Sequence, residues 1–209
     1  MKKISRGALS RGGWLIVLGV ALVVIDQIIK VLVKTNMTLG QSIDVLPWFK
    51  IAFVENEGMA FGMAFGGAVG KFCLSLFRIV LCGVLIWWIA KLERKDPKTP
   101  TGVLVGLTLI TAGAFGNIID CLFYGIIFSS STYTSVAYAF GGGYAPFMFG
   151  RVVDMFYFPL IDTTWPAWMP LIGGTPFKFF EPVFNFADSC VTCGAFYLIL
   201  FKWKFFSKD

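Results

Sequence analysis

The chain has 209 residues, of which 57% are hydrophobic and only 14% charged. Soluble domains carry about 25% charged residues, and the mean hydropathy here is +0.76, so the composition excludes an ordinary soluble protein and indicates an integral membrane protein. The net charge of +6 does not indicate nucleic-acid binding, because the basic residues form short clusters beside apolar runs, as topology-setting charges do.

Four segments are long and apolar enough to cross a bilayer, which requires about 20 residues each. The sequence predicts spanning helices at residues 14–33, 69–90, 103–124 and 186–206. The start of the chain resembles a signal peptide, but its apolar run lacks a small-residue cleavage site and continues as far as Lys30. We therefore expect a retained first helix and a single membrane domain over residues 1–209.

The charge distribution predicts which parts of the chain face the cytoplasm. Both termini and the loop at residues 91–98 are basic, so the positive-inside rule places all three in the cytoplasm. Residues 35–68 and 125–185 then lie on the outer face, where a β-prone run at 48–54 and many aromatic residues predict a β-rich cradle and an interfacial helical or loop segment. Residues 129–135 and 141–143 suggest a flexible excursion. The predicted fold is an all-α membrane protein with a small β element.

Polar residues within the first and third predicted helices are the first candidates for a site. Asp26 and Lys30 are four residues apart, in the favourable order for an ion pair. This pair is interpreted first as a packing contact between helices. Asn117 and Asp120 are three apart and are expected to share one helix face. They are candidates for hydrogen bonds between helices, or Asp120 for binding exposed backbone of the outer segment.

Two further aspartates lie among apolar residues near the outer ends of the predicted helices. Asp154 follows Arg151 by three residues, and Asp188 follows Asn185 with the same spacing as Asn117 and Asp120. A carboxylate beside hydrocarbon is costly and is by default a candidate for function. The alternatives are that Asp188 is a favourable anion near a helix N-terminus and that Asp154 pairs with Arg151. The predicted topology brings these carboxylates to one depth near the outer interface.

Five short blocks follow one another along the chain. They are Asp26-Gln27-Ile28-Ile29-Lys30, Asn56-Glu57-Gly58-Met59-Ala60-Phe61-Gly62, Gly113-Ala114-Phe115-Gly116-Asn117-Ile118-Ile119-Asp120, Arg151-Val152-Val153-Asp154-Met155-Phe156 and Phe184-Asn185-Phe186-Ala187-Asp188-Ser189. Together they resemble, in order and over nearly the whole chain, the blocks of the lipoprotein signal peptidases (signal peptidase II) of bacterial inner membranes. Two features depart from that pattern. Cys121 stands where the family commonly has Arg, so Arg151 is a candidate to supply the missing ion pair, and the stretches 125–151 and 162–181 are long.

The resemblance implies that Asp154 and Asp188 form a catalytic aspartate dyad. Two close carboxylates share one proton and titrate as a coupled pair, so one can activate water while the other donates a proton. The chain contains no histidine, which excludes a Ser-His-Asp triad, a Cys-His pair and an HExxH zinc site. We expect no cofactor and no metal. The residues expected to bind substrate or support the dyad are Asp26, Lys30, Asn56, Gly58, Asn117, Asp120, Arg151 and Asn185.

The implied substrate is a prolipoprotein that carries a diacylglyceryl group on a cysteine and is cut on the N-terminal side of that cysteine. The resemblance further implies a multi-pass enzyme of the bacterial cytoplasmic membrane that works among membrane lipids, with its active site near the outer face. We expect a monomer that binds no nucleic acid. The alternative function is a small proton- or cation-coupled transporter, because membrane carboxylates also form proton relays. A further alternative is a non-catalytic scaffold.

Overall fold

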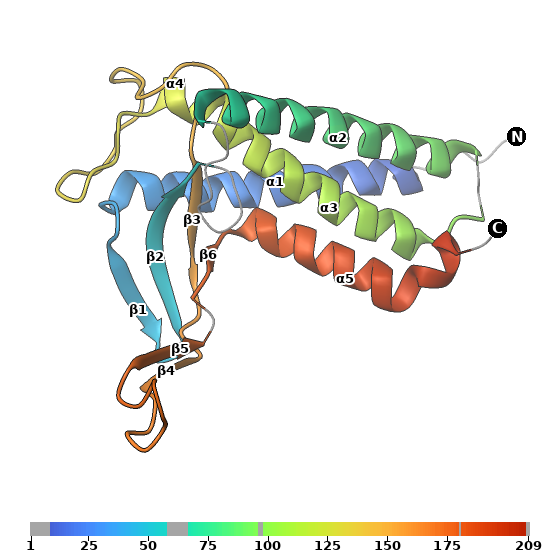
Figure 1. Ribbon diagram of the computed structural model, residues 1–209. Helices are drawn as coiled ribbons and strands as arrows, with labels where there is room; N and C mark the ends of the chain where they lie inside the picture. The colour runs from blue at the N-terminus through green and yellow to red at the C-terminus, as the bar shows by residue number, and fades with distance from the viewer. Residues whose placement is uncertain (1–8, 58–66, 96–97, 180, 208–209) are drawn as a thin grey trace, which may run out of the picture. The chain divides into compact units, whose positions relative to one another are not determined.

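The computed structural model describes residues 9–57, 67–95, 98–179 and 181–207 (Figure 1). Its chain folds as two compact units. The first falls within Met1–Ile28, Phe72–Ile119 and Phe186–Asp209, and the second within Ile29–Lys71 and Asp120–Asn185. The first unit is built from helices, whereas the second carries the strands.

Four long apolar helices dominate the fold, as the hydropathy predicts. They are α1 (Arg11–Asn36), α2 (Gly67–Lys95), α3 (Thr101–Ile119) and α5 (Phe186–Phe206). The third continues through a π-helical turn, η2 (Asp120–Tyr124), into the short α4 (Gly125–Ile127). By length and composition, all four of these segments could cross a membrane. Helices α1 and α2 are a few residues longer than predicted, because polar residues at their C-terminal ends extend them beyond the apolar runs. The third span passes its predicted end because η2 and α4 continue α3 as far as Ile127.

Within the first unit, α3 and α5 pack closely through small residues. A β-carbon placed on Gly113 would lie 2.3 Å from the backbone oxygen of Ala187, so only glycine allows this approach. Further along the same helices, Val103, Leu107 and Leu198 form a buried apolar cluster. In a bilayer the helices gain little from excluding water, so this close backbone approach is a main source of their association.

Gly113→Ala is expected to destabilise the protein by about 1–3 kcal/mol, because the added methyl forces α3 away from α5. Gly83 in α2 is the matched control, since a β-carbon there would have nothing within 4 Å. Gly83→Ala is expected to change stability by less than about 1 kcal/mol, in the stabilising direction. Thermal unfolding of both variants in the same detergent measures the difference. Equal melting temperatures would contradict the close packing of α3 on α5.

The second unit contains a four-stranded antiparallel sheet, which confirms the predicted β element. Its strands are β1 (Ser42–Leu46), β2 (Phe49–Asn56), β3 (Val152–Tyr157) and β6 (Val183–Phe184), in the order β1-β2-β3-β6. β2 includes most of the predicted β-prone run at 48–54. The register pairs Val54 with Asp154 and Glu55 with Val153. The first four residues of β3 are buried, so the polar groups beside β3 lie in a largely dry environment.

The two long stretches of the second outer segment are also ordered by hydrogen bonds. Phe128 and Ala139 form an antiparallel bridge, and the N–H of Ser129 donates to the carbonyl of Tyr138 at 2.9 Å, so hydrogen bonds close residues 128–140 into a loop. The flexibility expected of this stretch stays a prediction. Further on, β4 (Ile161–Thr164) pairs with β5 (Pro176–Phe179) as a separate hairpin. Strands therefore occur where the sequence suggested interfacial helical or loop segments.

Candidate active site

Asp154 is buried in β3 and held by two amide side chains. Asn185 Nδ2 donates to Asp154 Oδ1 at 2.7 Å, and Asn56 Nδ2 donates to Asp154 Oδ2 at 3.2 Å. Asn56 is the last residue of β2 and is opposite Val152, so the β2–β3 register delivers its amide to Asp154. Asn185 follows β6, the strand on the other side of β3. Because both oxygens accept hydrogen bonds, the carboxylate is fixed in orientation.

Asp188 lies in the first turn of α5, in the first unit. Asn117 Nδ2, from α3, donates to Asp188 Oδ1 at 2.8 Å. A negative charge in the first turn is favoured by the unpaired N–H groups and the dipole of the helix. Asn117 therefore forms a hydrogen bond between helices, one of the two roles considered for it from the sequence, and its partner is a candidate catalytic residue.

Asp26 supports the start of α5. Its Oδ1 accepts the backbone N–H of Ala187 at 2.9 Å, and its Oδ2 accepts Gln27 Nε2 at 3.1 Å. The Ala187 N–H is one of the helix-start donors that need a partner outside the helix. The contact leaves no spare volume, because a β-carbon on Gly116 would lie 2.6 Å from Asp26 Oδ2. Asp26 thus orders the turn that carries Asp188.

In the second unit, Lys30 and Asp120 form a completely buried ion pair. Their Nζ and Oδ2 atoms are 2.8 Å apart, and both side chains have a relative exposure of 0%. Asp120 Oδ2 also accepts the backbone N–H of Val153 at 3.3 Å, which agrees with the suggestion that Asp120 binds backbone of the outer segment. Asp120 opens the π-helical turn, a feature often found at functional sites. Lys30 and Asp120 thus hold the residue next to Asp154.

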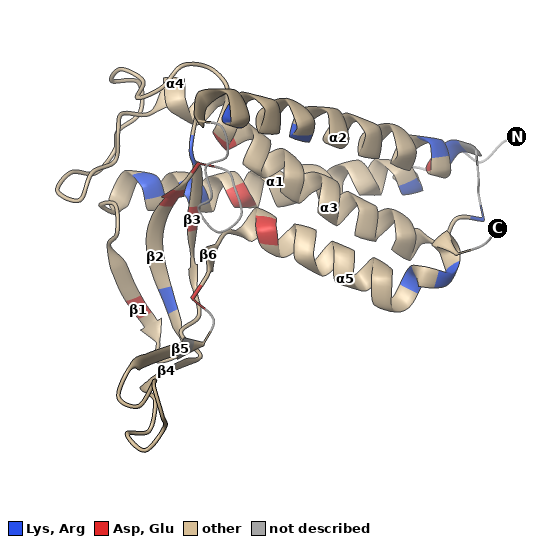
Figure 2. Cartoon of the chain, in the orientation of Figure 1, with Lys and Arg blue, Asp and Glu red and all other residues tan. Residues whose placement is uncertain are grey.

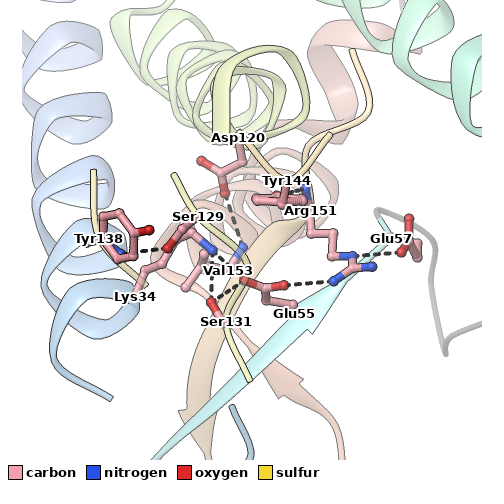
Figure 3. Close-up of polar contacts among 10 residues, drawn as sticks. All are labelled: Lys34, Glu55, Glu57, Asp120, Ser129, Ser131, Tyr138, Tyr144, Arg151 and Val153. Atoms are coloured by element: carbon pink, nitrogen blue, oxygen red, sulfur yellow. Dashed lines mark hydrogen bonds and ion pairs between the residues drawn. The ribbon is translucent and has the colours of Figure 1, made fainter. Parts of the chain in front are cut away.

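Arg151 pairs with two glutamates (Figure 3). Its Nη1 donates to Glu55 at 3.2 Å and its Nε to Glu57 at 2.9 Å. Two interpretations from the sequence are therefore wrong: Arg151 neither pairs with Asp154 nor supplies an ion pair to Asp120. The reason is the strand register, which puts Glu55 beside the start of β3.

Sequence reasoning missed a buried polar network around Glu55. This carboxylate, only 3% exposed, also forms an ion pair with the fully buried Lys34, and it accepts the hydroxyl of Ser131 at 2.7 Å. Lys34 Nζ lies 5.0 Å from the centre of the Tyr144 ring, and burial raises the pKa of Tyr144 well above its ordinary value. The available signal was a glutamate that stands directly before Asn56 and directly after the apolar residues 51–54 of β2. Gly58 of that block lies outside the described residues.

Glu57 lies between two cations and has a depressed pKa. Desolvation alone would raise its pKa, but hydrogen bonds and charge attraction from Lys71 and Arg151 outweigh this effect and lower the pKa below the ordinary value of 4.5. A depressed pKa stabilises the folded protein above the unfolded pKa, and this stabilisation disappears as the pH falls through the folded value. Glu57 thus makes the folded state acid-sensitive.

Glu57→Gln is expected to remove that acid-sensitive stabilisation. The stability difference between the parent chain and Glu57→Gln should be largest above pH 4.5 and should shrink as the pH falls below it. Because the Glu57 side chain is 49% exposed, solvent screening limits the difference to less than about 1 kcal/mol. Melting temperatures of both proteins across this pH range measure it. A difference that grows on acidification would contradict the assignment.

Comparison with known proteins identifies the family. Residues 18–204 match the family described as signal peptidase (SPase) II. A lipoprotein signal peptidase of Porphyromonas gingivalis is 55% identical over 87% of this chain and 79% of its own length. One from Amoebophilus asiaticus is 37% identical over 88% and 76%. A solved bacterial membrane enzyme shares the fold, with a TM-score of 0.60 and 24% identity over 93% of this chain and 90% of that one. The chain therefore belongs to the signal peptidase II family of aspartic peptidases.

Proposed function

We propose that this membrane enzyme cleaves signal peptides from diacylglyceryl-modified prolipoproteins, and that Asp154 and Asp188 are its catalytic pair. The relatives are named lipoprotein signal peptidases, which supports the substrate class. The observation that carries the proposal is the Asp154 carboxylate, buried and held on both oxygens by amides. One of these amides belongs to Asn185, and Asp188 follows it by three residues in the chain.

The proposed chemistry needs two carboxylates in different protonation states. When two such groups approach, they share one proton, so one is ionised and the other is neutral. The ionised carboxylate removes a proton from a water molecule, and the oxygen of that water attacks the scissile carbonyl carbon. The neutral carboxyl group donates its proton to the carbonyl oxygen. The C–N bond of the tetrahedral intermediate then breaks. The amine of the lipid-modified cysteine leaves with a proton from the dyad, and the signal peptide leaves as the carboxylic acid.

The remaining polar residues are proposed to hold substrate backbone or to position the dyad. Asn56 and Asn185 orient Asp154, and Asn117 orients Asp188. Asp26 positions the turn that carries Asp188 by accepting the N–H of Ala187. The Lys30–Asp120 pair positions the residue before Asp154 by accepting its N–H. Arg151 fixes the end of β2 through Glu55 and Glu57. For Gly58 we propose a role in substrate binding on sequence grounds alone.

We further propose that the enzyme acts as a monomer, as a single domain over residues 1–209, with its active site on the outer face of the cytoplasmic membrane. Figure 2 shows Lys and Arg gathered at the C-terminal ends of α2 and α5, and these ends carry Lys91 and Arg94, and Lys202 and Lys204. Such charges favour the cytoplasmic side. The opposite end of α5 carries Asp188, which supports an outer site.

The decisive experiment is cleavage of a defined precursor by the purified protein in detergent. We expect a precursor with a diacylglyceryl cysteine to be cut on the N-terminal side of that cysteine, as shown by the masses of both products, and the unmodified precursor to be cut far more slowly. Chelators and serine- or thiol-directed reagents are expected to have no effect. Cleavage that a chelator abolishes, or cleavage at another bond, would overturn the proposal.

A further inference from the structure

A cavity of about 410 Å³ lies within the second unit, beside the start of α2. Three charged side chains line it, those of Glu57, Lys71 and Arg151. The rest of the lining includes small and apolar residues, among them Gly67, Ala68 and Phe149. The charges of the lining give a net charge of +1, because Lys71 and Arg151 are opposed by Glu57. The proposed function uses Arg151 and Glu57 only to fix the end of β2, and it gives Lys71 no role.

The two cations keep hydrogen-bond donors available. Lys71 Nζ forms an ion pair with Glu57, and the Lys71 side chain is only 11% exposed. Arg151 uses Nε for Glu57 and Nη1 for Glu55. In the described part of the chain, no acceptor is bonded to Arg151 Nη2, and Lys71 uses one of its three donors. An anion in the cavity would therefore meet donors from both side chains without displacing Glu55.

The position of the cavity indicates which anion reaches it. Gly67, Ala68 and Lys71 belong to the first turns of α2, and α2 is a candidate membrane span from Gly67 to Arg94. The first turn of a spanning helix lies at the level of the lipid headgroups, where phosphates are concentrated. Ala68 and Phe149 add an apolar wall that suits the glycerol and the first acyl carbons. A soluble anion would gain nothing from that wall.

We propose that this cavity binds the headgroup phosphate of an anionic phospholipid. Arg151 and Lys71 are its ligands, because guanidinium and ammonium groups are the standard partners of phosphate oxygens. Glu57 is an internal anion that holds the two cations in place and competes with the lipid for their donors. The proposal concerns a lipid site and does not depend on the catalytic assignment, so either can fail without the other.

Opposite effects of two neutralising variants test the site. The full-length protein in a maltoside detergent is titrated with short-chain phosphatidylglycerol, and bound lipid is counted by native mass spectrometry. We expect saturable binding that Lys71→Gln weakens about tenfold, as for loss of one charged hydrogen bond. Glu57→Gln is expected to tighten binding severalfold, because it removes the competing carboxylate. If Glu57 and Lys71 were merely a structural pair, both variants would act in the same direction.

Matched controls distinguish the effect of the Lys71 charge on lipid binding from the effect of the cavity volume. Lys71→Arg keeps the charge and should retain binding, whereas Ala68→Phe fills the cavity without changing charge and should weaken it. Phosphatidylcholine of the same chain length and inorganic phosphate are expected to bind at least tenfold more weakly. Equal binding of inorganic phosphate would overturn the assignment to a lipid, and so would displacement of the lipid by a short acidic peptide. Unchanged affinity in both Lys71→Gln and Glu57→Gln would show that lipid binds elsewhere.

Discussion

Asp154→Asn and Asp188→Asn are each expected to slow cleavage of a lipid-modified precursor by about 10³-fold or more, while the protein still folds. An amide has the size of a carboxylate but cannot remove a proton from water or share one with a neighbour. The hydrogen bonds explain why folding survives. The new amide keeps one oxygen to accept from Asn185 at position 154, or from Asn117 at position 188. At position 154 the new NH2 group faces Asn56, whose amide can rotate to accept instead of donate.

The measurement is a single-turnover cleavage rate with saturating enzyme in excess over the precursor, with product masses recorded for each variant. The matched control is Asp44→Asn, because Asp44 is 73% exposed and forms a surface ion pair with Lys50 at 3.0 Å. The cleavage rate of this variant should stay within about twofold of the parent rate. The double variant of Asp154 and Asp188 should be little slower than either single one, since groups that act as a unit lose their contribution together. Full activity in either single variant would remove that residue from the dyad.

The sequence predicted the helices well because a membrane span has a physical minimum of about 20 apolar residues, and among the described residues only these four segments are long and apolar enough to cross a membrane. The strands were predicted only where β-prone residues are contiguous, as at 48–54. The hairpin of β4 and β5 was missed because its strands are four residues each, and such short runs carry no clear periodicity. The π-helical turn at Asp120 also leaves no mark in the hydropathy.

Some residues of the candidate site could likewise be predicted from the sequence, and others could not. Its central residues were found because each lies in a compact block, such as Asn185 with Asp188, and because an isolated carboxylate in apolar sequence is conspicuous. The network around Glu55 was not found. Its partners Lys34 and Arg151 are 21 and 96 residues away in the chain, and only the fold of the second unit brings them together. Long-range partners of this kind follow from tertiary structure and not from local pattern.

Lys30→Met is expected to lower the free energy of unfolding by about 3–5 kcal/mol, because it leaves the Asp120 carboxylate buried without the ammonium that balances it. The matched control is Lys50→Met, which breaks an ion pair with the exposed Asp44 and should cost less than about 1 kcal/mol. Denaturant titration in one detergent compares the two. Similar stability of both variants would show that the Lys30–Asp120 pair does not stabilise the fold.

Combining Lys30→Met with Asp120→Leu separates stability from catalysis. With both charges gone, most of the lost stability should return, since apolar pairs often replace buried ion pairs without loss. The free energy of unfolding of the double variant should remain about 1–3 kcal/mol below that of the parent chain, because the N–H of Val153 loses its acceptor. That N–H belongs to the residue before Asp154, so the folded double variant should still cleave slowly. Recovery of stability together with full activity would mean that the ion pair serves the fold alone; slow cleavage by a stable protein would mean that it also positions Asp154.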